Sequence, residues 1–316
     1  MKKNSKITLW LMLGAFAVCF LVRAYQIAVC TDMTTGFLYH DNSIVQNLMY
    51  YALVAFALAL AAVSAHFDVK RRGGGFDTAQ VVDARAAVIG FALLLVAICS
   101  LYEGYTEMSA ISPNAFLIFI DLAFGAAMAV IAFVTLYKKE FGAGLGFSYS
   151  VVGLYFTLRG ICVFLDHMVI NSVPEYLIEC LCVIGGAVFF TLLAKLFSGN
   201  GGRYTSAALC VWGVPTAVMT LSSALATIVC GAAAPEEIAE RITASSYTAE
   251  LYYQANYGSG AYMMTYTPWV NVAMGVFVAA ALVVLLLPNR KPAQADALDF
   301  EQPVPTASEQ PSPAED

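Results

Sequence analysis

Charge and histidine are scarce in this 316-residue chain. Charged residues make up 12% of it and histidine occurs three times, whereas hydrophobic residues make up 60%. Soluble domains carry about 25% charged residues, so the composition excludes an ordinary soluble globular protein. Three histidines leave most metalloenzyme schemes short of ligands, and no dinucleotide-binding, zinc-protease or nucleophile-elbow motif stands in a workable context. We therefore expect a non-enzymatic protein with no catalytic residue, cofactor, metal site or nucleic-acid partner.

Long apolar segments take the place of the missing polar residues. A hydrocarbon core about 30 Å thick is crossed by about 20 residues of helix. Strands of a membrane barrel would be about 10 residues long with an alternating pattern, but residues 44–65 contain neither a charge nor an alternation. The sequence therefore predicts an all-α, polytopic membrane helix bundle with eight transmembrane helices. The expected helices are residues 7–29, 43–65, 86–105, 114–136, 146–168, 173–196, 205–230 and 268–288.

Basic residues alternate between the loops and so orient these helices. Thirteen of the sixteen Lys and Arg residues fall on one side of the membrane if all eight segments span it. Because cytoplasmic loops carry the excess of Lys and Arg, both termini are predicted to be cytoplasmic, in a cell membrane. The basic, apolar N-terminus is interpreted as a retained anchor, since no convincing small-residue cleavage site follows it. The exceptions to the charge pattern are Arg23, Arg159 and Arg241.

Residues 1–291 are predicted to form one transmembrane domain. Residues 292–316 are rich in Pro, Ala, Gln and acids, which is typical of a disordered tail. The sizeable external segment is residues 231–267, where six of the seventeen tyrosines fall between Tyr247 and Tyr266. Tyrosine is common at membrane interfaces, so this loop is expected either to lie on the outer surface or to cover a cavity as a lid.

The two halves of this domain, residues 1–140 and 141–291, resemble each other faintly. Arg23 and Arg159 occupy corresponding places in their first helices, and an Asn-Ser pair follows each of those helices. An even number of helices per half would give parallel repeats related by an axis along the membrane normal. The sequence is therefore compatible with a 4+4 parallel pseudo-repeat.

Charged residues within the spans are the most informative ones for function. At a rise of 1.5 Å per residue, Arg159 lies about 20 Å from the inner end of its helix, and Asp121 and Glu179 lie about 10 Å from the outer ends of theirs. These three residues thus share one depth. Since a charge at the bilayer centre costs roughly 2.5–3.5 kcal/mol on insertion scales, we expect them to face the bundle interior and to pair. They then form either a ligand site or ion pairs that only fix helix register, with Arg23 extending outward to the interface.

Further polar residues gather in the outer half of the bundle. Thr216, Thr220, Ser223 and Thr227 recur at helical spacing and predict one polar stripe, which either faces a cavity or bonds to the backbone of its own helix. The inner halves contain no charge apart from interfacial Lys195. The residues proposed to bind a ligand are Arg23, Arg159, Asp121, Glu179, Glu103, Gln26, Asn47, Thr220 and Ser223.

This distribution predicts a transporter-like or sensor-like protein whose polar cavity opens to the extracytoplasmic side, with the lipid bilayer and a small polar or zwitterionic ligand as its partners. A structural or assembly subunit, in which the charges only pair helices, is the alternative, and a membrane-integral enzyme is the third. The sequence singles out no substrate, coupling ion or oligomeric state. Cys30 and Cys230 lie at outer helix ends and would pair only if their helices are neighbours. A metal site would need two loops to bring together His40, Asp41, Asp166 and His167.

Overall fold

The computed structural model describes residues 3–30, 84–108, 114–138, 146–167, 174–200, 205–232 and 269–286. The regular structure in these ranges is helical, and seven of the helices are long and apolar enough to cross a membrane. The helices are α1 (Lys3–Tyr25), which continues into the π-helical turn η1 (Gln26–Cys30), α3 (Ala84–Met108), α4 (Ala115–Lys138), α5 (Gly146–His167), α6 (Pro174–Phe197), α7 (Thr205–Ala232) and α9 (Trp269–Leu286).

The described helices agree with seven of the eight predicted spans to within a few residues at each end. The remaining predicted span, residues 43–65, lies outside the described residues, as do the tyrosine-rich loop at 231–267, apart from its first two residues, and the tail at 292–316. A multi-pass membrane protein is thus the class that the described helices fit. The agreement follows from the physics of the bilayer, since its thickness sets the length of each apolar segment.

Ordinary capping residues mark several helix ends. The side-chain Oδ1 of Asn114 accepts hydrogen bonds from the backbone N–H groups of Phe116 and Leu117, both at 3.2 Å, and so caps the start of α4. The backbone N–H of Asn114 in turn donates to Glu107 at 3.0 Å, which ties the end of α3 to that start. Beyond α6, Gly199 has a φ of 74°, a conformation that favours glycine after a helix end.

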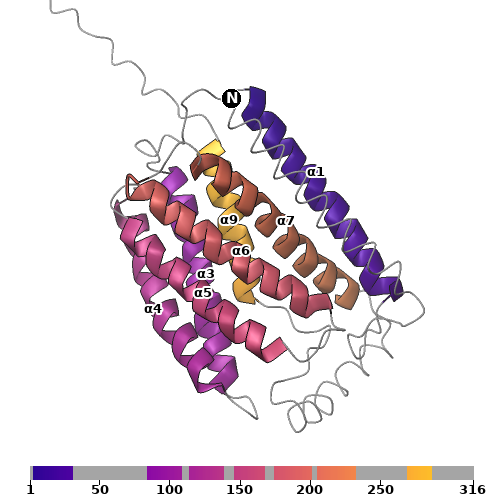
Figure 1. Ribbon diagram of the computed structural model, residues 1–316, viewed down its shortest axis with the longest axis horizontal. Coiled ribbons are helices and arrows are strands. Elements are labelled where there is room, and N and C mark those ends of the chain that lie inside the picture. Colours follow the sequence, from indigo (N-terminus) through magenta and orange to yellow (C-terminus); the bar gives the residue numbers. More distant parts are fainter. Residues whose placement is uncertain are drawn as a thin grey trace, which may run out of the picture.

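The helix α9 occupies the centre of the described bundle. It packs against α3, α6 and α7, and it is the most deeply buried of the seven spans. Around it, α3 packs on α4, α4 on α5, α5 on α6 and α6 on α7, while α1 lies at the edge of the bundle against α7 (Figure 1). The last described helix thus lies among α3, α6 and α7 and does not simply follow α7 in a row.

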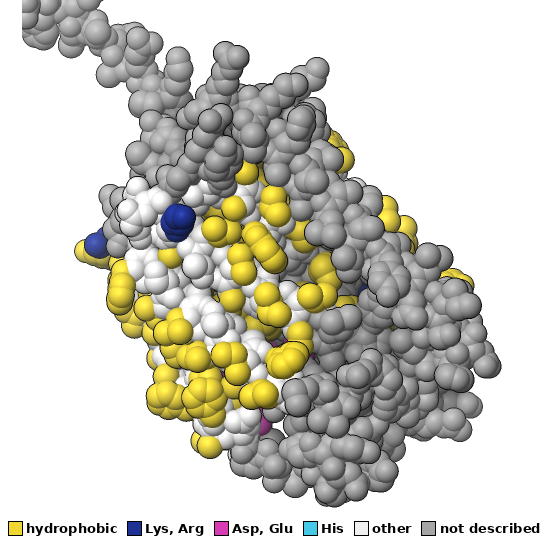
Figure 2. Space-filling model, viewed as in Figure 1, with side chains coloured by type: hydrophobic (Ala, Val, Ile, Leu, Met, Phe, Trp, Pro, Cys, Tyr) yellow, Lys and Arg dark blue, Asp and Glu magenta, His cyan; other side chains and the backbone are white. Residues whose placement is uncertain are grey.

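Large apolar side chains cover the outside of this bundle. Trp10 on α1 and Phe119 and Phe133 on α4 are each more than half exposed. The described part of the face in Figure 2 is dominated by hydrophobic side chains, with few charged ones among them. A surface of this kind is suited to lipid rather than to water, because the hydrocarbon core has no hydrogen-bonding partners to offer.

Small residues let the central helices approach closely. A Cβ atom added to Gly186 of α6 would collide with the Sδ atom of Met274 on α9. One added to Gly275 of α9 would lie 3.0 Å from the Cβ of Thr220 on α7. Glycine at such crossings allows close backbone packing between membrane helices, so α9 is held against both α6 and α7.

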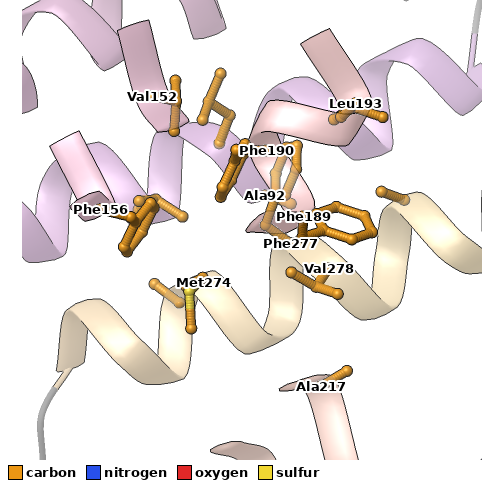
Figure 3. Packing of buried hydrophobic residues seen from close by; sticks show 14 of the residues in the cluster. Ala92, Val152, Phe156, Phe189, Phe190, Leu193, Ala217, Met274, Phe277 and Val278 are labelled. Carbon is orange, nitrogen blue, oxygen red and sulfur yellow. The ribbon is translucent and has the colours of Figure 1, made fainter. Parts of the chain in front are cut away.

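Aromatic side chains from three helices fill the middle of the bundle. Phe190 of α6 stacks on Phe156 of α5, with ring centroids 5.2 Å apart, and on Phe277 of α9, with centroids 4.8 Å apart. Tyr149 of α5 packs beside Phe190 and Phe277, and all four side chains are inaccessible to solvent. Figure 3 shows Phe190 and Phe277 facing each other here, with Phe156 beside them. We call Tyr149, Phe156, Phe190 and Phe277 the aromatic cluster.

Candidate functional site

Arg159 joins three helices through its guanidinium group. Its Nη1 donates to both carboxylate oxygens of Asp121 on α4, each at 2.9 Å, and its Nη2 pairs with Oε2 of Glu103 on α3. Arg159, Asp121 and Glu103 are 2%, 1% and 8% exposed. The pairing of Arg159 with Asp121, predicted from their common depth, is thus confirmed. We call Glu103, Asp121 and Arg159 the arginine cluster.

Two hydroxyl groups complete the surroundings of Asp121. The Tyr155 hydroxyl donates to Oδ1 of Asp121 at 2.8 Å. The Ser100 hydroxyl lies 3.1 Å from that of Tyr155 and 2.9 Å from the backbone oxygen of Asp121. Neither residue was among the predicted site residues. Tyr155 was detectable, because it precedes Arg159 by four positions and so lies on the same face of α5.

The arginine cluster also reaches the start of α9. The backbone N–H of Val270 donates to Oε1 of Glu103 at 2.8 Å. The first N–H groups of a helix have no partner within the helix, and a negative charge is favourable at this end. Glu103 therefore binds a guanidinium with one oxygen and the first turn of the central helix with the other.

Glu179 of α6 lies beside this point. Its Oε1 accepts a hydrogen bond at 3.4 Å from the side-chain Nδ2 of Asn271, the residue that follows Val270. Glu103 interacts electrostatically with Glu179 as well as with Asp121. Three carboxylates and Asn271 thus gather at one level of the bundle. This level lies near the ends of α3 and α5 and within the first two turns of α4, α6 and α9. We call the part of the bundle that contains Glu103, Asp121, Arg159, Glu179 and Asn271 the polar half.

Negative charge exceeds positive charge in the arginine cluster. Within the part of the chain that the structure describes, Glu103 and Asp121 both form their ion pairs with Arg159. The cluster therefore holds two carboxyl groups for one guanidinium group in a buried site. Burial of a charge without a full counter-charge is costly, so this cluster is suited to taking up a further positive charge.

Arg23 lies in a different place from the arginine cluster. Its side chain is 1% exposed and its Nη1 pairs with Oε1 of Gln26 in η1. The expectation that Arg23 extends outward to the interface is therefore wrong. Its helix, α1, packs on α7, where the Cys230 thiol lies 3.7 Å from the backbone oxygen of Ala24. Arg159, by contrast, pairs from α5 with residues of α3 and α4. The two arginines therefore belong to different helix interfaces.

The threonine hydroxyls of the polar stripe bond to the backbone of α7 itself. The hydroxyls of Thr216, Thr220 and Thr227 each donate to the backbone oxygen four residues earlier, at 2.7, 2.7 and 3.0 Å. This is the backbone-bonding interpretation of the stripe. Ser223 contributes its backbone oxygen to Thr227 and its side chain is half-buried. The Thr220 hydroxyl thus has a partner within α7, and its side chain also packs against Gly275.

The other sequence-based candidates have simple outcomes. Asn47, His40 and Asp41 lie outside the described residues, and the side chains of Asp166 and His167 are not described. In the described ranges, no group of three or more His, Cys, Asp or Glu side chains is arranged to hold a metal ion. The helices of Cys30 and Cys230 are neighbours, as a disulfide would require, but no disulfide joins these two described cysteines.

One hollow on the described surface is apolar. It lies where the end of α3 meets the start of α4, and it contains no charged side chain; its lining residues are Met108, Ala115, Ile118, Phe119, Leu122 and Ala123. Such a hollow fits a hydrocarbon surrounding. The polar chemistry of the described bundle is therefore found in the packed arginine cluster and not in this groove.

No protein family, curated protein or solved structure was found to match this chain. Its function therefore has to be argued from the cluster and its surroundings.

Proposed function

We propose that this is a sensor-like protein of the cell membrane, which recognises a small polar ligand at the polar half of an eight-span bundle. The eighth span is the predicted helix at residues 43–65. The pattern of basic residues predicts cytoplasmic termini, and with that orientation the polar half faces the outside. A 4+4 pseudo-repeat, with Arg23 and Arg159 in corresponding helices, remains a prediction from the sequence alone.

The observation that carries the proposal is the unequal number of acidic and basic side chains in the arginine cluster. Glu103 and Asp121 share the one guanidinium of Arg159. A purely structural ion pair would be neutral, because an excess charge in a low-dielectric interior opposes folding. Charged groups placed within a membrane usually mark a ligand or ion site for this reason.

The aromatic cluster favours a sensor over a transporter. A transporter places its substrate near the midplane and must open to both sides in turn. Below the arginine cluster, the stacked rings of Phe156, Phe190 and Phe277 fill the space between α5, α6 and α9. Tyr155 connects the two regions, since its hydroxyl binds Asp121 and its ring packs on Phe156 with centroids 4.9 Å apart. A ligand bound above these rings has no polar path through the described helices.

The link from Glu103 to Val270 supplies a way to report binding. A ligand can shift an equilibrium only by contacting two states differently. The Glu103 carboxylate accepts a hydrogen bond from the first turn of α9. A ligand that competes for this carboxylate would therefore weaken the bond between α3 and the central helix. The sensor proposal therefore includes a response as well as a binding site.

A structural or assembly subunit is the second candidate. The observation in its favour is that both carboxylates of the arginine cluster already have partners within the bundle. Asp121 accepts hydrogen bonds from Arg159 and Tyr155. Glu103 accepts a hydrogen bond from the backbone of Val270 and pairs with Arg159. Such a network also fixes helix register without any ligand. It predicts a protein partner that co-purifies with the chain.

Thermal unfolding of the purified full-length protein in detergent tests these alternatives. We expect one ligand class among organic anions, zwitterions, amines and neutral sugars to raise the unfolding midpoint in a saturable way. The rise should disappear in Arg159→Lys, which keeps the charge but loses the planar fork. It should remain in Arg85→Lys, a matched change at the opposite end of α3. Midpoints that ignore every class, together with a co-purifying partner, would establish the structural alternative.

A further inference from the structure

Asn271 has a buried oxygen atom without a hydrogen-bond donor. The side chain is 2% exposed, and its Nδ2 donates to Glu179. Its Oδ1 atom is solvent-inaccessible and accepts no hydrogen bond in the structure. Buried polar atoms are nearly always bonded, so an exception calls for an explanation such as a missing ligand or water. Here the atom offers an acceptor site at the first turn of the central helix.

The charges around Asn271 select what would bind there. The amide of Asn271 contacts Glu179, and the N–H of the preceding residue, Val270, contacts Glu103. Glu103 already shares Arg159 with Asp121, so negative charge exceeds positive charge in that cluster. An excess of negative charge beside an acceptor oxygen favours a cation that carries hydrogen-bond donors.

A metal ion fits these residues less well than an ammonium group. Hard metal ions require several oxygen ligands at short and similar distances. Among the described residues, no three acidic, His or Cys side chains are arranged in that way. An ammonium group needs only separate acceptors for its N–H groups, because each forms a directional hydrogen bond. Asn271 Oδ1 and the carboxylate of Glu179 are acceptors of this kind.

We propose that the polar half binds an ammonium group, held by Asn271 and Glu179 and attracted by the charge of Glu103. The ligand is either the free ammonium ion or a small primary amine. The inference rests on the proposed function, since it assigns a chemical class to the ligand of the same site. Binding there engages residues next to Val270, so it acts at the point where α3 holds α9.

Cation selectivity tests this proposal directly. The purified full-length protein in detergent is unfolded thermally at constant pH and ionic strength with chloride salts of ammonium, methylammonium, ethylammonium, potassium and tetramethylammonium. Potassium resembles ammonium in size but has no N–H donors, and tetramethylammonium has the charge without the donors. We expect the unfolding midpoint to rise in a saturable way only with cations that carry N–H groups. The rise should be roughly 5 °C at concentrations a hundredfold above the dissociation constant.

The source of the ligand follows from the same titrations. A rise with ammonium alone identifies the free ion, and a larger rise with methylammonium or ethylammonium identifies an organic amine. Asn271→Leu and Glu179→Gln should each abolish the rise, and Glu179→Gln decides if Asn271→Leu does not fold. Ser222→Ala, a buried change on α7 outside the site, should retain it.

Three results would overturn the ammonium site: an equal rise with potassium or tetramethylammonium, a rise that persists in both site variants, or no rise with any amine. In the last case an ordered water would account for Asn271. If another ligand class then stabilises the wild type but not Arg159→Lys, the ammonium inference alone fails. If no class does so, the proposed function fails with it.

Discussion

The backbone N–H of Val270 donates to the carboxylate of Glu103 at 2.8 Å, although the two residues are 167 positions apart in the chain. This bond joins the end of α3 to the start of α9. The second oxygen of the same carboxylate pairs with Arg159 on α5. Glu103 thus connects α3 and α5 to the central helix α9.

Glu103→Gln should change the free energy of unfolding by no more than about 1.5 kcal/mol, because removal of the excess carboxylate from the arginine cluster offsets part of the lost charged hydrogen bond. The amide keeps an oxygen for Val270 but loses the charge that Arg159 pairs with, and hydrogen bonds to charged groups are worth about 1.5–3 kcal/mol. Glu103→Leu should cost more, about 2–4 kcal/mol, because it removes the hydrogen bonds to both Arg159 and Val270, while Arg159 keeps Asp121 as its counter-charge. Denaturation in detergent micelles measures both changes. Tyr102→Phe, on the exposed side of the same turn, is the control, and a leucine variant as stable as the wild type would contradict the prediction.

Tyr155→Phe should cost about 1.5–3 kcal/mol, since it removes a hydroxyl that donates to the carboxylate of Asp121. Ser100→Ala should cost less, because its hydroxyl bonds to neutral groups. The two changes share a partner, so the double variant should deviate from additivity by at least about 0.5 kcal/mol. Strict additivity in a double-mutant cycle would show that Ser100 and Tyr155 do not act together.

Gly186→Ala should destabilise the bundle by about 1–3 kcal/mol through overpacking, because the added Cβ would meet Met274 on α9. Gly186→Ala should cost less in a Met274→Ala background, where the added methyl group has room, while Met274→Ala is itself destabilising because it empties a buried site. Gly14→Ala is the matched control: a Cβ there meets nothing within 4 Å, and alanine favours a helix over glycine by about 1 kcal/mol. Equal midpoints for the two alanine variants would refute the close approach of α6 to α9.

Thr227→Val should change the free energy of unfolding by no more than about 0.5 kcal/mol and leave ligand-induced stabilisation intact. Its hydroxyl bonds to the backbone oxygen of Ser223 within α7, a bond that adds little to a helix. Thermal unfolding with and without ligand measures both quantities. A loss of the ligand response in this variant would mean that the polar stripe belongs to the binding site after all.

The sequence was sufficient for the seven described spans and for one ion pair. Span lengths follow from membrane thickness, and counting residues along each helix placed Arg159 and Asp121 at one depth, where they do pair. The partnership of Glu103 with Val270 was not predictable in this way. It depends on α3 and α9 being neighbours, and apolar helices carry little information about which neighbour they choose.

The position of Arg23 was missed for a related reason. A long side chain near a helix end reaches toward water when its helix faces lipid. In the structure Arg23 is 1% exposed and pairs with Gln26, and the sequence does not encode locally whether such a side chain is enclosed or reaches water. The stripe on α7 shows the converse, because its local hydroxyl-to-carbonyl bonds depend only on spacing within one helix.

The central place of α9 has a consequence for biogenesis. Ribosomes deliver α3, α6 and α7 before α9, and domains form from the N-terminal side as synthesis proceeds. The helices that surround the bundle axis therefore enter the bilayer before the helix that fills it. Until α9 arrives, Glu103 lacks the amide of Val270 and the interior lacks Phe277, so the insertion of the last described helix is the step at which this bundle becomes closed.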